Sequence, residues 1–316
     1  MMNYALFTGC QIPENAPQYE TAARRVLGAL EVGVRDLPFN CCGYPMRDMY
    51  FESFMLASAK NMALAESKGL NILTLCKCCL GTLKRAQTFL NRHGNLRTLV
   101  NDILGREGLI YSGSCQVEHL QSVLYHQLGV EMISDRVVRP FSGLKVAAMY
   151  GCHALRPSRV TGFDNPYDPH IIDDLLRAIG VESVPWEGRL KCCGAPLRHK
   201  NPALSLTTIQ ERIDECDQAG AQVLGVDCPH TLEQIKWALD NLGAEGLGSI
   251  RGVALYPQML GLALGLEPRE LGLDENRPRS GCVANFLQQG GSPAEATNPS
   301  FKYRAALPLE HDLHME

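Results

Sequence analysis

An internal repeat constrains the fold of this chain more than any other feature. The segment CCGYPMR begins at Cys41, and the near-copy CCGAPLR begins at Cys192. Apolar segments that end at a cysteine stand on both sides of each copy, which pairs Cys10 with Cys152 and Cys76 with Cys228. The three pairs are offset by 142, 151 and 152 residues. One duplicated unit with about nine residues inserted in its first loop accounts for all three offsets.

Each copy alternates short apolar strands with amphipathic helices. The predicted strands are 3–7, 71–75, 145–149 and 222–226, and the predicted helices are 18–30, 51–67, 169–178 and 205–219. This alternation predicts an α/β fold made of two tandem parallel-sheet units with helices on the sheets. Ligands of such sheets collect at the carboxyl ends of the strands, where Cys10, Cys76, Cys152 and Cys228 stand, so we expect ligand-binding loops there.

The segment RPFSGLK, 139–145, is polar and contains both proline and glycine, as is typical of a linker. We therefore predict a first domain over 1–142 and a second over 143–275. The remaining residues, 276–316, are rich in Pro, Gly, Asn and Ser. We expect an extended C-terminal tail there, either ordered against a partner or without fixed structure.

The charge and the termini narrow the class of protein. The chain has 316 residues, 30 of them basic and 34 acidic, for a net charge of −4, which does not indicate nucleic-acid or anionic-membrane binding. The start MMNYALFTGC lacks a basic region and a long apolar run, so we expect no signal peptide. No run of about 18 apolar residues predicts a membrane span. We expect a cytoplasmic protein, whose 13 cysteines stay reduced and available to metal.

The first unit offers five cysteines in the repeated pattern: Cys10, Cys41, Cys42, Cys76 and Cys79. Thiolates prefer zinc, copper(I) or iron–sulfur clusters. A tetrahedral zinc ion takes only four ligands, so five cysteines favour a multi-iron cluster.

The second unit is an incomplete copy. It retains Cys152, Cys192, Cys193 and Cys228, but Thr231 stands where the first unit has Cys79. His230 could serve as a metal ligand or could cap the following helix. These residues predict an altered iron–sulfur cluster, a zinc ion or an empty site.

The remaining cysteines and histidines have weaker signals. Cys78 lies inside the first Cys-x-x-Cys and is interpreted as a spare thiol that points away. Core packing is the simpler interpretation for Cys115 and Cys216. His119 and His126 fall in a predicted helix that begins at Cys115, where structural roles are commoner than metal ligation.

His153 follows a cysteine of the second motif and is a candidate catalytic proton donor. A hydrogen bond from its ring to cluster sulfur is the alternative. Arg47, Arg156 and Arg198 could offset cluster charge or bind an anionic substrate, or they could be ordinary surface residues.

Two blocks of this sequence resemble a known family. The segment from Tyr150 to Glu182 with the following LKCCGA, and the segment TLCKCCLGTL, are similar to the B subunit of heterodisulfide reductase, which is built from cysteine-rich "CCG" domains. The resemblance implies a non-cubane [4Fe–4S] cluster on the five cysteines of the first motif. It carries over to the second motif only at Cys152, Cys192, Cys193 and Cys228.

The resemblance also implies partners and a reaction. In the family, two clusters face each other and cleave a disulfide in one-electron steps, with electrons from a ferredoxin-like C subunit that is fed by a flavin-containing A subunit. We therefore expect the B subunit of a heterodisulfide reductase-like complex, with the sulfur-oxidation type as a candidate, acting on a small thiol, disulfide or sulfur carrier. The alternatives are a zinc-stabilised scaffold that docks redox partners, and the iron–sulfur subunit of a glycolate or lactate oxidoreductase.

Overall fold

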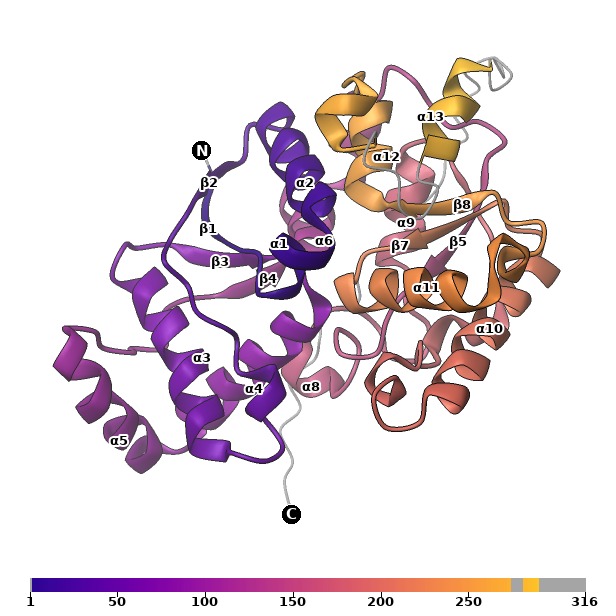
Figure 1. The fold of residues 1–316 in the computed structure, drawn as a ribbon. Helices are drawn as coiled ribbons and strands as arrows, with labels where there is room; N and C mark the ends of the chain where they lie inside the picture. The colour runs from indigo at the N-terminus through magenta and orange to yellow at the C-terminus, as the bar shows by residue number, and fades with distance from the viewer. Residues whose placement is uncertain (1, 274–280, 290–316) are drawn as a thin grey trace.

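Two parallel sheets, one in each repeat, form the framework of the protein (Figure 1). The structure is a computed structural model, and the residues it describes are 2–273 and 281–289. Each sheet has four strands, in the order β2-β1-β3-β4 in the first and β6-β5-β7-β8 in the second, and every pair of neighbours is parallel. The predicted fold, two tandem α/β units, is confirmed.

The first repeat contains the strands β1 Asn3–Phe7, β2 Gly33–Arg35, β3 Asn71–Thr74 and β4 Val117–His119. Its longer helices are α2 Pro17–Ala29, α3 Phe51–Glu66, α4 Lys77–Arg92 and α5 Gly94–Leu104. Shorter helical segments are α1 Gln11–Asn15, η1 Tyr44–Met46, η2 Gly105–Glu107, α6 Leu120–Ser122, the π-helix η3 Val123–Leu128 and α7 Val130–Asp135. Helix α2 lies on one face of the sheet, and α3 and α4 lie on the other (Figure 1).

The second repeat contains the strands β5 Lys145–Met149, β6 Glu182–Ser183, β7 Val223–Val226 and β8 Gly252–Leu255. Its longer helices are α9 Ile171–Ala178, α10 Pro202–Gln218, α11 Pro229–Leu242 and α12 Tyr256–Ala263. The short segments are α8 Ser158–Thr161, η4 Glu187–Leu190, η5 Ala195–Leu197, η6 Ala244–Leu247 and η7 Pro268–Leu271. Asn201 caps α10 by accepting a hydrogen bond from the Leu204 amide, as Ser, Asn and Asp do at helix starts.

The strands predicted from the repeat are present in both copies, because each is an apolar run that the sheet buries on both faces. β1 and β5 share the same burial pattern, an exposed first residue followed by four buried ones. Tyr4 pairs with Asn71 in the first sheet, and Val146 pairs with Val223 in the second. These central pairs hold the carboxyl ends of β1 and β3, and of β5 and β7, at one edge of each sheet.

The prediction of a helix that begins at Cys115 is wrong. Residues 117–119 form β4, which pairs with β3, and helical structure starts only at Leu120. Buried Val117 and His119 alternate with the partly exposed Glu118, which is the pattern of a strand rather than a helix. The segment is too short for its periodicity to reveal this from the sequence.

The two repeats pack extensively against each other. Helix α12 of the second repeat lies beside α2 of the first, and α4 contacts α8 (Figure 1). The Tyr19 hydroxyl donates a hydrogen bond of 3.2 Å to the Asp227 carbonyl oxygen. At the same junction the Lys236 ammonium group donates a hydrogen bond of 2.6 Å to the Asn15 carbonyl oxygen. The carboxyl ends of the central strands therefore open onto a shared junction.

Part of the predicted extended tail is helical. Residues Gly281–Gln288 form α13, which contacts β8, and Phe286 stacks on Phe141 at 6.4 Å between ring centroids. The apolar side chains of this short segment explain the difference, because they can be buried against the second repeat. The rest of the predicted tail lies outside the described residues. Among the described residues, no helix has the length and apolar character needed to cross a membrane.

Candidate metal centres at the junction of the repeats

The Cys-Cys-Gly-x-Pro segments form matching turns. Gly43 and Gly194 adopt left-handed backbone conformations, with φ of 93° and 81°, that favour glycine. In each copy the proline then lies in the first turn of a short 3₁₀ helix, η1 or η5. The Ser58 hydroxyl fixes the first turn through a 2.7 Å hydrogen bond to the Cys42 carbonyl oxygen. The motif occurs twice because this turn presents two adjacent thiols at the end of each sheet.

The structure brings together the cysteines predicted for the first site. Cys42 receives a hydrogen bond from Cys41 and also interacts with Cys79, and these contacts lower the pKa of the Cys42 thiol to about 4. Cys79 in turn is hydrogen-bonded to Cys76, the N-cap residue of α4. Cys10 is the N-cap residue of α1 and lies near enough to Cys41 to contribute electrostatically to the raised pKa of that thiol. The thiols therefore form one connected group, and their role as ligands stays a prediction.

The second group of cysteines is arranged in the same way. Cys192 is hydrogen-bonded to Cys152 and to Cys193, and the pKa of the Cys192 thiol falls well below its ordinary value for that reason. Thr231 interacts with Cys193 through its side chain, just as Cys79 does with Cys42. Threonine therefore occupies the place of the missing fifth cysteine, and the alignment of the two repeats holds at the level of side-chain contacts.

Cys78 does not point away from the sites. Its Sγ lies 3.0 Å from His153 Nδ1, a contact between the two repeats. A hydrogen bond from Cys78 lowers the pKa of the Cys228 thiol to about 7. The ligand atoms of Cys76, Cys78 and His230 lie within 4.8 Å of one another. The prediction that Cys78 points away is wrong, because the first turn of α4 faces the second repeat.

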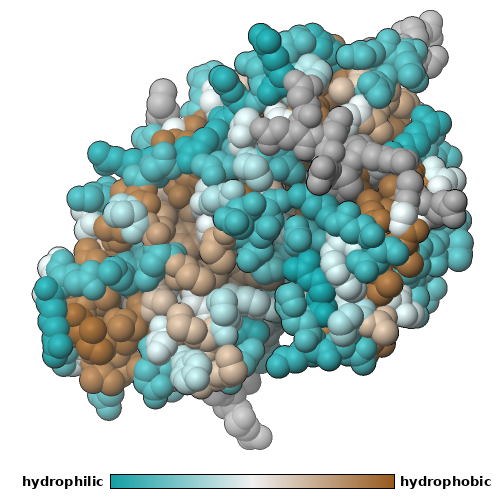
Figure 2. All heavy atoms as spheres, in the orientation of Figure 1, coloured by the Kyte–Doolittle hydropathy of each residue, from teal (hydrophilic) through white to brown (hydrophobic). Residues whose placement is uncertain are grey.

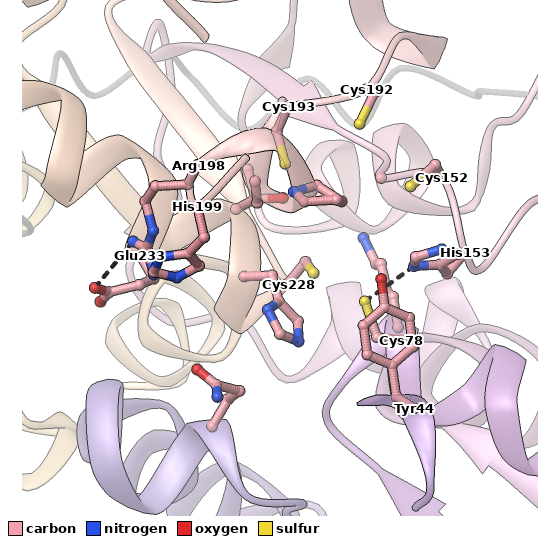
Figure 3. Close-up of a pocket in the computed structure, with 17 residues that line it drawn as sticks. Tyr44, Cys78, Cys152, His153, Cys192, Cys193, Arg198, His199, Cys228 and Glu233 are labelled. Atoms are coloured by element: carbon pink, nitrogen blue, oxygen red, sulfur yellow. Dashed lines mark hydrogen bonds and ion pairs between the residues drawn. The ribbon is translucent and has the colours of Figure 1, made fainter. Parts of the chain in front are cut away.

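A cavity of about 240 Å³ lies between the repeats. In Figure 3 the sulfur atoms of Cys78, Cys152, Cys192, Cys193 and Cys228 are arranged around one space. The rest of the lining is Gln11, Tyr44, Lys77, Gly151, His153, Ala195, Pro196, Arg198, His199, His230, Thr231 and Glu233. The first group of cysteines lies outside this lining, so the cavity belongs to the second group and to residues that reach it from the first repeat.

Lys77 is the most unusual residue in the lining. It is 1% exposed, and its Nζ has no hydrogen-bond partner among the described residues, although it lies 6.0 Å from the centroid of the Phe163 ring. Burial lowers the pKa of this ammonium group, while Asp227, Cys228 and Cys76 act in the opposite direction. A buried cation without a hydrogen bond is costly, so the site favours an anionic occupant beside Lys77.

Asp227, which precedes Cys228, is a buried acidic residue at the junction. Its carboxylate accepts hydrogen bonds from the Gln121 side chain and from the Tyr256 amide. Burial raises the pKa of Asp227 to about 6, against the opposing effect of Lys77. The carboxylate therefore ties residues of both repeats together beside the cavity.

Aromatic and imidazole rings form one wall of the cavity. The Tyr44 ring lies 5.2 Å from the His153 ring and 5.8 Å from the His230 ring, measured between centroids. Burial is the main cause that lowers the pKa of His153, followed by Arg47. The ring also lies beside the Cys78 thiol, and the role of His153 as a proton donor stays a prediction.

The three candidate arginines have different surroundings. Arg198 lines the cavity, and its guanidinium lies 3.4 Å from the Glu233 carboxylate. Arg47 lies over the Tyr44 ring, 5.1 Å from its centroid. Arg156 donates hydrogen bonds to two backbone oxygens of the second repeat and does not line the cavity. Only Arg198 is therefore placed to meet a molecule inside the cavity.

Sequence reasoning missed Lys77, Asp227 and Tyr44. A signal existed for the first two, since a charged residue adjoins a motif cysteine right after an apolar strand, where ligands of parallel sheets collect. Tyr44 is the variable position of Cys-Cys-Gly-x-Pro, and only the packing of the repeats brings it to His153.

The donor set fits a metal–thiolate centre. Several thiols converge at the ends of the strands, and the buried ammonium of Lys77 supplies a countercharge. Glycine is required close to the first group, because a β-carbon on Gly9 would lie 2.9 Å from Cys79 Sγ. These are properties of a compact thiolate site with little room for additional protein atoms.

Comparison with known proteins agrees with this arrangement. The family model described as the cysteine-rich domain, CCG, matches twice, at residues 4–84 and 146–236. The chain is 32% identical to the B subunit of the ferredoxin/F(420)H(2)-dependent CoB-CoM heterodisulfide reductase of Methanosarcina acetivorans, over 87% of this chain and 94% of that protein. It is 30% identical to the 8-methylmenaquinol:fumarate reductase membrane anchor subunit of Wolinella succinogenes, over 86% and 96%.

A solved structure shares the fold. The crystal structure of a hypothetical protein from Helicobacter pylori superimposes with a TM-score of 0.67 at 19% identity. The match covers 86% of this chain but about half, 51%, of that one. Two matched domains and similarity along nearly the whole chain therefore assign the family. The chain belongs to the family of heterodisulfide reductase B subunits and carries its cysteine-rich domain twice.

Proposed function

We propose that this protein is the iron–sulfur B subunit of a heterodisulfide reductase-like complex, in which it transfers electrons to a small disulfide or sulfur carrier. The observation that carries the proposal is that one group of cysteines lies on each side of the repeat junction and that the second group faces a cavity. A redox subunit needs a centre that carries electrons and a cavity that binds substrate. The cysteine groups could hold the centre, and the cavity beside them could bind the substrate.

The first site would hold a non-cubane [4Fe–4S] cluster on Cys10, Cys41, Cys42, Cys76 and Cys79. The second would hold an altered cluster on Cys152, Cys192, Cys193 and Cys228, with His230 as a further candidate ligand. These sites belong to the units that we propose over 1–142 and 143–275. When bound, such clusters supply single electrons at a potential set by their surroundings.

Reduction of a disulfide consumes two electrons and two protons and releases two thiols. The electrons would come from a ferredoxin-like partner, and the sulfur–sulfur bond is the bond that breaks. We propose that His153 holds a proton for one leaving thiolate, because its ring lies at the cavity wall next to Cys78. Arg198 and His199 offer polar contacts to the substrate from the second repeat.

Partners are expected to include a ferredoxin-like C subunit and a flavin-containing A subunit. Exposed apolar side chains support an assembly: on and after α5, Leu99 is 56% exposed and Ile110 is 69% exposed. Figure 2 shows hydrophobic residues gathered over this part of the molecule. Apolar surface of this kind is often buried by a partner. We propose a cytoplasmic location for the complex. We also propose that the complex is of the sulfur-oxidation type.

A zinc-stabilised scaffold is the second candidate function, favoured by Thr231 in place of the fifth cysteine. An iron–sulfur subunit of a glycolate or lactate oxidoreductase is the third, although the duplicated domain favours the first. Anaerobic analysis of iron, zinc and acid-labile sulfide, with EPR of the oxidised protein, separates these candidates. We expect about four to eight irons per chain with matching sulfide. Zinc without iron would overturn the redox function.

A further inference from the structure

The second thiol group lacks one donor within its own repeat. Thr231 fills the place of Cys79, and its hydroxyl interacts with Cys193. A hydroxyl is a harder and far less acidic ligand than a thiolate, so it is a poor substitute toward iron. His230 could add a nitrogen donor from the same repeat, but a second site with five thiolates, like the first, requires a cysteine from elsewhere.

Cys78 of the first repeat is placed to be that donor. It lines the cavity together with all four cysteines of the second group. Its thiol is hydrogen-bonded to Cys228, and the five sulfur atoms surround one space in Figure 3. His153 Nδ1, 3.0 Å from the Cys78 sulfur, is positioned to donate an N–H bond to a coordinated thiolate.

Lys77 gives a second, independent sign of an anionic occupant. Its side chain passes Gly151, where an added β-carbon would lie 3.4 Å from Lys77 Cδ, and its Nζ is buried without a hydrogen-bond partner in the cavity lining. Five thiolates carry more negative charge than a [4Fe–4S] core neutralises, so a bound centre would offset the ammonium charge.

We propose that Cys78 supplies the fifth thiolate of the second metal site across the boundary between the repeats. This proposal rests on the proposed function, because it assumes that both sites bind iron. The second site is then built from both halves of the chain, and Thr231 does not mark a lost centre.

The test compares the iron content of anaerobically prepared full-length variants. Cys78→Ser should lower iron from about eight to about four per chain, with the same loss of sulfide. The double variant Cys78→Ser/Thr231→Cys should regain the lost iron, because the thiolate returns at the regular position of the second motif. Cys115→Ser, which removes a buried thiol outside the cavity lining, is the matched control and should keep all iron. Cys78→Ala repeats the test without a hydroxyl, and circular dichroism verifies that each variant is folded.

Several results would overturn the proposal. One is an unchanged iron content in folded Cys78→Ser or Cys78→Ala. Another is a loss of iron that the added Thr231→Cys does not restore, since Cys78 would then act on the first site. Loss of zinc with unchanged iron would instead indicate a mononuclear site at Cys76, Cys78 and His230. A wild-type protein with only about four irons would overturn this inference but leave the proposed function intact. A wild-type protein without iron would overturn the proposed function itself.

Discussion

A β-carbon on Gly81 would lie 2.6 Å from the carbonyl oxygen of His153. Gly81 belongs to α4 of the first repeat, and His153 follows Cys152 in the second. Real β-carbons do not approach another atom this closely, so only glycine permits this packing. The backbone contact sets the distance between α4 and the loop that carries Cys152 of the second group of cysteines.

Gly81→Ala should separate α4 from the loop at His153. We expect loss of iron from the second site, and a loss of stability of about 1–3 kcal/mol from overpacking. Iron analysis and thermal unfolding measure the two effects. Gly28→Ala is the control, since Gly28 is also helical but an added β-carbon would meet nothing within 4 Å. Equal behaviour of the two variants would contradict a close contact at Gly81.

Gly9→Ala should weaken the first site. An added β-carbon would lie 2.9 Å from Cys79 Sγ, and the backbone at Gly9 has a φ of 72°. Gly69→Ala shares the left-handed backbone, with a φ of 64°, but nothing lies within 4 Å of its added β-carbon. Both variants should lose about 1 kcal/mol of stability from backbone strain. Only Gly9→Ala should lose iron, and retention of iron there would show that the site can shift.

Cys41→Ser and Cys42→Ser should each remove the first cluster and lower the unfolding temperature. Metal binding contributes to folding free energy, so the loaded protein loses that contribution. We expect about four fewer irons per chain. Iron analysis and calorimetry provide the measurement, with Cys115→Ser as control. Wild-type iron content in either variant would exclude that cysteine as a required ligand.

Lys77→Met should act mainly on the metal-loaded protein. The metal-free protein should change little in stability, because removal of the buried ammonium charge is offset by the loss of its attraction to Asp227. The loaded protein should release iron to a chelator faster, because the countercharge is lost. Lys84→Met, on the same helix but outside the cavity lining, should not accelerate release. Equal release rates in the two variants would rule out a role for Lys77 at the site.

His119 should make the protein sensitive to acid. The Leu75 carbonyl oxygen lies 3.2 Å from its Nε2, the Gln121 amide donates to its Nδ1, and burial lowers the pKa of the ring to about 3. An unfolded histidine has a pKa of about 6.5, so between these values the unfolded chain binds the extra proton. The stabilisation is complete above about pH 6.5 and falls by about 1.4 kcal/mol per pH unit below it.

His119→Gln removes this titration. Urea unfolding of the metal-free protein between about pH 7 and 4 should show a smaller loss of stability in the variant than in the wild type. Parallel curves for the two proteins would mean that His119 does not stay neutral in the fold. His126→Gln, at an exposed histidine, is the matched control.

The sequence is sufficient to predict the parts of the structure that repeat. β1 and β5, and the positions of Cys42 and Cys193, follow from apolar runs and motif spacing that occur twice. The short strands β2, β4, β6 and β8 do not follow from it, because two to four residues carry little periodicity. Their formation depends on neighbouring strands.

The cavity could not be predicted in the same way. Cys78 and Lys77 face it only because the first turn of α4 is directed at the other repeat, which depends on how the two sheets pack. The sequence motif alone assigns each cysteine to the metal site of the repeat in which it occurs. Contacts between copies, such as that of Cys78 with His153, are set by tertiary structure.

Helix α12, from the end of the second repeat, lies against α2 from the beginning of the first. All of its residues are buried, so a chain cut between the repeats would leave an apolar helix face exposed on one fragment and a bare groove on the other. Separating the two repeats would therefore expose apolar surface to water, so the duplicated units share one hydrophobic interface in addition to the cavity between them.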